Sequence, residues 1–391
     1  MARLDGQVVF VRHALPGERV RIRITERNKR FLRADAVEVL EAAPGRVEPP
    51  CPYAGDCGGC DFQHASPAAQ RDLLTSVVRE QLQRLAGIEW TGQVEAVAPD
   101  DLGWRTRVTW AVDRSGRAGL RRHRSHDVVP VDRCLIAHPD LPVVLDQQWD
   151  DHAVESIVSS TGERLVVTDA SISDEMEERV EGVVARDGTE RGGSRHLRER
   201  VHHRMFRVTG SGFWQVHPAA ATTLVDAVLA AADVRPGDLV ADLYAGVGLF
   251  TAFLAEATGP TGRVVWVEAD RGAAVDAHEN LAGLPVDLVP RRTEHALRRG
   301  EVGEQADVVV LDPPRTGAKE AVADIAALGA RTVVYVACDP AALARDLKTF
   351  AEHGYRLDAL RAFALFPMTH HVECVAALSR GSRADQSSLA I

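Results

Sequence analysis

The sequence of 391 residues lacks the features that would assign it to a membrane, secreted or repeat protein. No apolar run approaches the length needed to span a bilayer. The N-terminal stretch MARLDGQVVFVRHALPGERV lacks the layout of a signal peptide, and no internal repeat is visible. We therefore expect a cytoplasmic protein without a membrane partner, long enough for two or three domains.

The chain has few cysteines and a net negative charge, but both cysteines and basic residues are concentrated in particular segments. Six cysteines are too few for a disulfide framework in a chain of this length, and three of them lie between residues 51 and 60, which indicates metal or redox chemistry. The net charge of -10 excludes a uniformly basic nucleic-acid binder. Residues 1–47 nevertheless carry ten Lys/Arg against six Asp/Glu, and residues 104–133 carry eight Arg against three Asp. Such local basic faces favour a polyanionic partner, with a merely solvated surface as the alternative.

Residues 1–47 contain three short runs with strand character, QVVFVRHA, RVRIRITE and FLRADAVEVLE, with basic residues interleaved. They predict a small β-barrel, a fold that often binds oligonucleotides on one face. Three strands are few for a closed barrel, and Met1 stands directly before the first of them. We therefore expect a further strand upstream that this chain lacks.

The three clustered cysteines follow the spacing Cys51-x5-Cys57-x2-Cys60 in a glycine-rich loop. Three thiolates around one centre need a fourth ligand, and Cys134 is the best candidate because the remaining cysteines lie in the C-terminal domain. An iron–sulfur cluster and a zinc ion held by four cysteines are both compatible with this spacing.

The segment 48–207 has a mixed pattern. Ser66 and Pro67 start an apolar-periodic run that stops at Gly87, which predicts one amphipathic helix with a packing role. Alternating strands and a short acidic helix-like run follow. The His202–His203 pair matches no metal-ligand pattern, and we expect it to be solvated.

From residue 219 onward, helix and strand patterns alternate. The pattern predicts a doubly wound α/β domain over residues 208–380, followed by a flexible tail at 381–391. Ligands in such sheets bind beyond the carboxyl ends of the strands. The expected helices are 219–232, 249–257, 271–282, 318–328 and 341–352.

The first polar motif of this domain is Asp242-Leu-Tyr-Ala-Gly-Val-Gly248, directly after its first strand. The glycines allow a ligand to approach the backbone, but Thr251 stands where a dinucleotide fingerprint has its third glycine. Glu268 ends the second strand, where it could hold ribose hydroxyls. The motif therefore indicates an adenosine-type ligand without a pyrophosphate.

Three further motifs lie at strand ends. The run Asp312-Pro-Pro-Arg315 forms a rigid platform suited to a flat base, with a plain turn as the alternative. Cys338 lies between a buried strand and a helix opened by Asp339-Pro340. The positive end of that helix favours a thiolate, and the alternative is a buried structural cysteine. Glu373 enters the last strand and could act as a base if it shares a crevice with Cys338.

Together these motifs identify a family. The runs DLYAGVGLF, LDPPRTG, VYVACDPAALARDL and THHVE, preceded by FWQVHP and the three-cysteine cluster, resemble the uracil-C5 RNA methyltransferase family. The chain is most similar to the iron–sulfur branch that methylates 23S ribosomal RNA, from a TRAM-like N-terminal barrel to about residue 380. Two positions depart from the family, Trp214 where phenylalanine is commoner and His217 where asparagine is frequent.

The resemblance implies a fold and a site. The fold would be α/β, with a class I (Rossmann-like) S-adenosylmethionine methyltransferase domain, a TRAM/OB-like β-barrel and a central mixed α/β RNA-binding domain at 48–207. Cys338 would be the nucleophile and Glu373 the base. A [4Fe-4S] cluster, favoured over zinc, would be held by Cys51, Cys57, Cys60 and Cys134. S-adenosylmethionine would be bound by Gln215, Tyr244, Gly246, Gly248, Glu268 and Asp312.

The chemistry agrees with these residue types. Uracil C5 is too weak a nucleophile to attack a sulfonium methyl unaided, and addition of a thiolate to C6 activates it. The base must leave its stack, which favours a loop or single-stranded target. We expect a monomer that acts on RNA rather than DNA, most simply 23S ribosomal RNA. The alternatives are a transfer-RNA uracil methyltransferase, a cytosine-C5 enzyme, and a non-catalytic iron–sulfur protein that binds RNA or senses oxidants.

Overall fold

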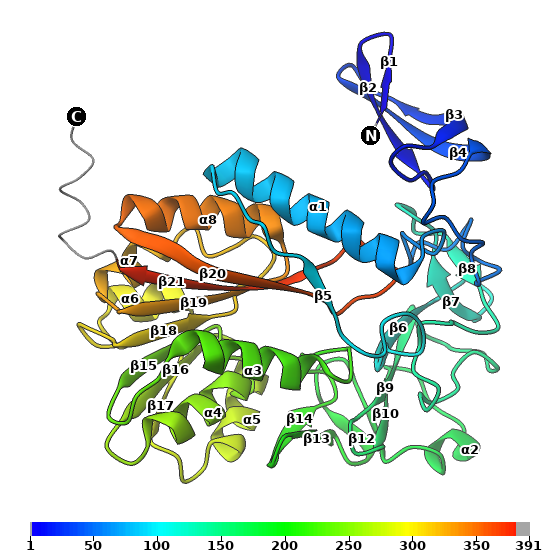
Figure 1. Ribbon diagram of the computed structural model, residues 1–391. Helices are drawn as coiled ribbons and strands as arrows, with labels where there is room; N and C mark the ends of the chain where they lie inside the picture. Colours follow the sequence, from blue (N-terminus) through cyan, green and yellow to red (C-terminus); the bar gives the residue numbers. More distant parts are fainter. Residues whose placement is uncertain (1, 381–391) are drawn as a thin grey trace, which may run out of the picture.

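The structure is a computed structural model that describes residues 2–380, so the predicted flexible tail 381–391 lies outside the described residues. The chain forms a small N-terminal sheet, a central sheet and a larger C-terminal α/β unit (Figure 1). No helix in the described part of the chain is both long and apolar enough to cross a membrane.

The N-terminal sheet has four strands in the order β1-β2-β4-β3, where three were predicted. The additional strand forms because residues 2–4 turn back at Asp5 and Gly6, both with positive φ, and pair antiparallel with the next strand. A small core of Val9, Leu32 and Ala34 holds the sheet together. The strands are β1 (Ala2–Leu4), β2 (Gln7–Arg12), β3 (Arg19–Arg27) and β4 (Phe31–Glu41).

The central unit is a seven-stranded sheet in the order β12-β11-β10-β9-β6-β7-β8, followed by the hairpin β13–β14. The predicted acidic helix is a single turn, α2 (Asp174–Glu177). The strands are β6 (Arg107–Val112), β7 (Ala118–Arg121), β8 (Val128–Pro130), β9 (Ala153–Val158), β10 (Arg164–Val167), β11 (Gly182–Val184), β12 (Glu190–Gly193), β13 (His196–Val201) and β14 (Arg204–Thr209).

The C-terminal unit is built on an eight-stranded sheet in the order β17-β16-β15-β18-β19-β21-β20-β5. Every neighbouring pair is parallel except those of β21, which runs antiparallel to both β19 and β20. The strands are β5 (Val94–Ala96), β15 (Leu239–Leu243), β16 (Arg263–Glu268), β17 (Val286–Pro290), β18 (Val308–Leu311), β19 (Thr332–Ala337), β20 (Tyr355–Ala364) and β21 (Glu373–Arg380).

Helices cover both faces of this sheet, as a doubly wound domain requires. One apolar core contains α3 (Ala220–Ala232), α4 (Leu249–Thr258) and α5 (Arg271–Asn280). The other contains α1 (Pro67–Ala86), α6 (Thr293–Arg298), α7 (Val322–Ala327) and α8 (Pro340–Glu352). The short helix α6 was not anticipated, and α7 is shorter than the predicted helix 318–328.

Helix α1 (Pro67–Ala86) has the predicted ends, with Ser66 as N-cap and Gly87 in the left-handed conformation. It buries Leu74, Val78 and Leu82 in the same core as α8, and each such side chain contributes about 2 kcal/mol on burial. Figure 1 shows α1 alongside α8, and β5 extends the sheet by pairing with β20. Residues 67–96 thus pack with the C-terminal unit, although the sequence placed them in the central domain.

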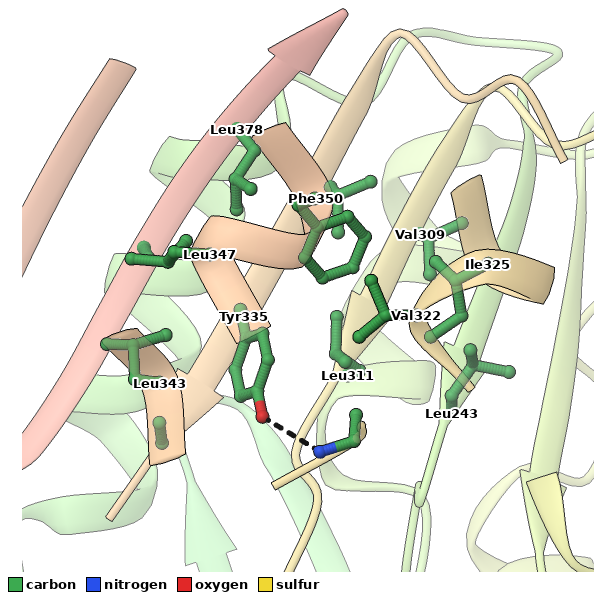
Figure 2. Close-up of a cluster of buried hydrophobic side chains, with 14 of the residues drawn as sticks. Leu243, Val309, Leu311, Val322, Ile325, Tyr335, Leu343, Leu347, Phe350 and Leu378 are labelled. Atoms are coloured by element: carbon green, nitrogen blue, oxygen red, sulfur yellow. Dashed lines mark hydrogen bonds between the residues drawn. The ribbon is translucent and has the colours of Figure 1, made fainter. Parts of the chain in front are cut away.

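The core beneath α8 also fixes the loop that follows β18. Tyr335 and Asp346 are buried, and the Tyr335 hydroxyl donates to Asp346 Oδ2 at 2.7 Å. The backbone N–H of Ala318 donates to the same carboxylate at 2.7 Å and to the Tyr335 hydroxyl at 3.2 Å, the second bond being dashed in Figure 2. These bonds anchor the end of the Asp312–Gly317 loop.

Candidate active site

The predicted nucleophile and base face each other across two paired strands. In the register of β19 and β21, Ala337 lies opposite Cys374. Cys338 is the next residue beyond Ala337, and Glu373 is the residue before Cys374, so antiparallel pairing brings them opposite one another. Asp312 follows the neighbouring strand β18 at the same edge of the sheet.

Cys338 lies at the predicted turn between β19 and α8. Asp339 is the N-cap of α8, with its side chain accepting from the Ala342 N–H at 2.7 Å, and Pro340 starts the helix. Burial, followed by the nearby Glu373 and Asp312 carboxylates, raises the pKa of the partly buried Cys338 thiol to about 11. Burial and the two carboxylates thus oppose the effect that the sequence predicts for the helix end.

Glu373 is 5% exposed at the start of β21. Burial and the nearby Asp312 raise its pKa well above the usual value, and the Arg315 guanidinium opposes that shift. The pKa of Asp312 is itself raised by burial and by the Asp242 carboxyl. A carboxyl group with a raised pKa can take up a proton near neutral pH, which suits a general base.

A large cavity of about 730 Å³ reaches this edge of the sheet at Asp312. It gathers five of the six residues predicted to bind the cofactor: Gln215, Tyr244, Gly246, Glu268 and Asp312. Gly248 does not line the cavity. It is the left-handed N-cap of α4, and a Cβ there would stand 2.9 Å from Leu281, so its absence of a side chain serves helix packing.

Residues of the motif between Asp242 and Gly248 form part of the cavity wall. Tyr244 has a positive φ of 60°, and its hydroxyl donates to Glu294 at 3.0 Å. A Cβ on Gly246 would meet no atom within 4 Å, so the cavity reaches the backbone there. Glu268 accepts from the Gly246 N–H at 3.1 Å and from the Asp270 N–H at 2.8 Å, which fixes its carboxylate at the cavity wall.

The cavity also contains polar residues that the sequence analysis did not predict, among them Thr293 and Glu294. Thr293 and Glu294 line it from the first turn of α6, and the Thr293 hydroxyl is buried without a partner. The fully buried Asp242 likewise keeps one oxygen without a partner, and burial raises its pKa to about 7. The acidic residue in the first turn after β17 was the available signal for Glu294, but a six-residue helix has little periodicity.

All four predicted metal-binding cysteines line one small cavity of about 30 Å³. Cys51, Cys57 and Cys60 come from the glycine-rich loop, and Cys134 comes from the segment after β8. Burial raises the pKa of the Cys60 thiol to about 12. Within residues 2–380, however, no three His, Cys, Asp or Glu side chains are arranged as ligands of a single metal ion.

The remaining expectations concern histidines. His202 contacts Asp226 and His203 contacts Glu256, both at the surface, as expected for solvated side chains. His217 is buried, with Nε2 at 3.0 Å from the carbonyl oxygen of Pro99. His217 therefore provides a polar link to the segment after β5.

Comparison with known proteins agrees with this geometry. The tRNA (Uracil-5-)-methyltransferase family profile matches residues 302–381, which include Asp312, Cys338 and Glu373, and a TRAM domain profile matches residues 1–37. An uncharacterized RNA methyltransferase of Streptomyces avermitilis is 48% identical over 97% of this chain and 94% of its own length. The 23S rRNA (uracil(1939)-C(5))-methyltransferase RlmD of Alkalilimnicola ehrlichii is 32% identical over 97% of this chain and 93% of its own.

The chain belongs to the uracil-C5 RNA methyltransferase family. Among solved structures, the tRNA (uracil-54, C5)-methyltransferase of Pyrococcus abyssi in complex with S-adenosyl-L-homocysteine is similar with a TM-score of 0.70. That match covers 95% of this chain and 94% of the archaeal one at 23% identity. The predicted α/β methyltransferase fold with an N-terminal TRAM domain is confirmed, and RNA is the substrate class of this family.

In this uracil-C5 RNA methyltransferase, Arg315 lowers the pKa of both Cys338 and Glu373. Replacing it by glutamine should raise both pKa values and move the rise of methyl-transfer rate with pH to higher pH. Single-turnover rates between about pH 6.5 and 9.5 test this. The Arg315→Lys variant keeps the charge and should retain the wild-type dependence of rate on pH. If the Arg315→Gln and wild-type profiles superimpose, Arg315 does not influence the titrating groups.

Proposed function

We propose that this protein uses S-adenosylmethionine to methylate C5 of a uridine in RNA, most simply in 23S ribosomal RNA. The observation that carries the proposal is that Cys338 and Glu373 lie opposite one another at the ends of β19 and β21. Asp312, at the end of the neighbouring strand, lines the 730 Å³ cavity. The function needs one thiol nucleophile, one base and a cofactor cavity beside them.

The cavity fits S-adenosylmethionine in its chemistry. Glu268 supplies carboxylate oxygens for ribose hydroxyls, and Gly246 leaves its backbone open to the ligand. The buried and unpartnered oxygens of Thr293 and Asp242 provide further polar groups near the cavity. Gln215, Tyr244 and Asp312 complete the proposed contacts. When bound, the cofactor supplies an electrophilic methyl group on a sulfonium ion.

The protein's own residues account for activation of the uracil. The Cys338 thiol gives its proton to water. The sulfur then bonds to C6 as the C5–C6 double bond breaks, which places negative charge on C5 and O4. C5 can then accept the methyl group. Arg315, on the rigid Pro313–Pro314 platform, favours the thiolate. Desolvation by the bound base would strengthen this effect of Arg315.

Release of the product depends on Glu373. After methylation C5 still carries its original hydrogen, and Glu373 removes this proton while the bond from C6 to sulfur breaks. The electron pair of the C5–H bond forms the ring double bond, and Cys338 leaves as a thiolate. The raised pKa of Glu373, caused by burial and Asp312, makes it a stronger base than an exposed carboxylate.

The choice of RNA follows from the relatives. The RlmD relative at 32% identity acts on 23S rRNA according to its name, whereas the transfer-RNA enzyme of known structure is 23% identical. We therefore propose 23S ribosomal RNA as the substrate, with transfer RNA as the second candidate. The pairing of Cys338 and Glu373 argues against a non-catalytic RNA-binding or redox-sensing role.

We also propose that Cys51, Cys57, Cys60 and Cys134 hold a [4Fe-4S] cluster. Four sulfur donors and no carboxylate or imidazole favour iron–sulfur or zinc, and the four cysteines line a common cavity. Gly58 supports the tight loop, since a Cβ there would stand 2.8 Å from the backbone of His123. The chemistry at Cys338 needs no electron transfer, so the cluster has a structural role.

Substitutions of Cys338 and Glu373 should block different steps of the proposed reaction. Cys338→Ala should abolish methyl transfer and covalent binding of RNA, because no other group can attack C6. Glu373→Gln should form the bond to C6 but release product at least about 100-fold more slowly. Denaturing gels would then show a protein–RNA adduct with the Gln variant only. Release at the wild-type rate would remove Glu373 from its assigned role.

The substrate is tested by supplying labelled S-adenosylmethionine with unmodified 23S ribosomal RNA or unmodified transfer RNA. We expect 5-methyluridine only in the ribosomal RNA. Its appearance only in transfer RNA would keep the chemistry and change the substrate. Labelled 5-methylcytidine, or no methylation by protein with intact iron content, would overturn the proposed function.

Serine substitution of any one of the four cysteines should reduce bound iron from about four per chain and remove the visible absorbance of the cluster. Cys338→Ala is the matched control, because it removes a thiol elsewhere and should keep the iron. One zinc ion per purified wild-type chain, with no iron or sulfide, would show that the site is a zinc site.

A further inference from the structure

Residues 51–60, which carry three of the four clustered cysteines, are called the cysteine loop below. The segment that follows this loop is hydrogen-bonded to the loop that leads into Glu373, the proposed base. The backbone N–H groups of Asp61 and Phe62 both donate to the carbonyl oxygen of Met368, at 2.7 and 3.0 Å. The Met368 N–H donates to the side-chain oxygen of Gln70 at 2.8 Å. Two segments about three hundred residues apart in sequence are thereby held together at one residue.

A charged contact extends this connection towards the active site. The Asp61 carboxylate accepts from His370 Nδ1 at 2.6 Å and from the His370 backbone N–H at 3.2 Å. His370 lies three residues before Glu373, and Asp61 directly follows Cys60. The contact between Asp61 and His370 therefore links the residue after Cys60 to the segment that enters β21 at Glu373.

The loop needs such support. Met368 has a φ of 68°, a left-handed conformation that side chains other than glycine rarely adopt and that surrounding contacts must maintain. Met368 is buried and packs in one small core with Trp104 and Ile136, which the half-buried Cys60 and Cys134 also contact. The conformation of the loop thus depends on residues that surround the cysteine cavity.

We propose that Asp61 is a positioning residue, which acts through His370 to hold Glu373 in place for removal of the C5 proton. The cysteine loop then has a defined purpose in the reaction, because it fixes the position of the base. This inference rests on the proposed function. It assigns to the cysteine loop an effect on product release in addition to any effect on RNA binding.

The stage of the reaction that is affected distinguishes positioning from general destabilisation. Formation of the covalent bond requires Cys338, whereas its cleavage requires Glu373. In Asp61→Ala, we expect the adduct to form at nearly the wild-type rate and to break down about 10- to 100-fold more slowly, with KM for RNA changed less than about threefold. Rapid-quench single turnovers on unmodified RNA, resolved on denaturing gels, measure both steps.

Asp56→Ala is the matched control. Asp56 lies in the same loop, but its carboxylate pairs at the surface with Arg122, which lies outside the segment that leads into β21. It should release product at the wild-type rate. Iron content and melting temperature of both variants show whether the loop and the fold survive the substitution.

A second variant keeps the test decisive if Asp61→Ala loses iron or stability. His370→Ala removes the contact from the opposite side, outside the cysteine loop, and should retain iron while showing the same slow release. If the contact acts as one unit, the double variant should be no slower than either single variant. Normal release in His370→Ala, or a raised KM with unchanged kcat, would overturn the inference and indicate an RNA contact.

The failure of this inference is distinguishable from failure of the proposed function. If the wild-type protein forms neither adduct nor 5-methyluridine on either RNA, the proposed function fails. If the wild-type and Asp56→Ala proteins turn over normally and the Asp61 and His370 variants do as well, only the positioning role fails.

Discussion

The antiparallel pairing of β21 with β19 is the constraint on which the proposed chemistry depends. In a fully parallel sheet, a strand following β19 would bring its carboxyl end, and not its first residue, to the ligand-binding edge. Because β21 runs in the opposite direction, its first residue Glu373 lies beside Cys338, which follows the last residue of β19. The proposed nucleophile and base thus lie at one edge of the sheet, although a helix and another strand separate them in sequence.

Three buried carboxyl groups lie at or near this edge of the sheet. Burial raises the pKa values of Asp242, Asp312 and Glu373. For Asp312 and Glu373, a neighbouring carboxyl group is the second cause. Their folded-state pKa values exceed those of the unfolded chain, so they favour the folded state at low pH and disfavour it as the pH rises through the raised values. The apolar cores on both faces of the sheet must offset this cost.

Much of the catalytic unit was predictable because its signals are local. The turn from β19 to α8 is specified by an apolar run, Cys338, the Asp339 cap and Pro340, all adjacent in sequence. The position of Gly248 was predictable, but its role was not, because its constraint is contact with Leu281, more than thirty residues away. Likewise, β1 and α6 are too short for a periodic pattern, and only tertiary pairing defines them.

Long-range packing also determines where the catalytic unit ends. Periodicity identified α1 as an amphipathic helix, but no pattern indicates that its apolar face lies with α8 or that β5 would pair with β20. Both elements come directly after the cysteine loop, and Gln70 of α1 bonds to Met368 in the loop before β21. The segment 61–96 therefore contributes an edge strand, a covering helix and the support for the loop before Glu373. For this reason the cysteine loop and the eight-stranded sheet are better described as one packed structural unit than as two domains joined by a linker.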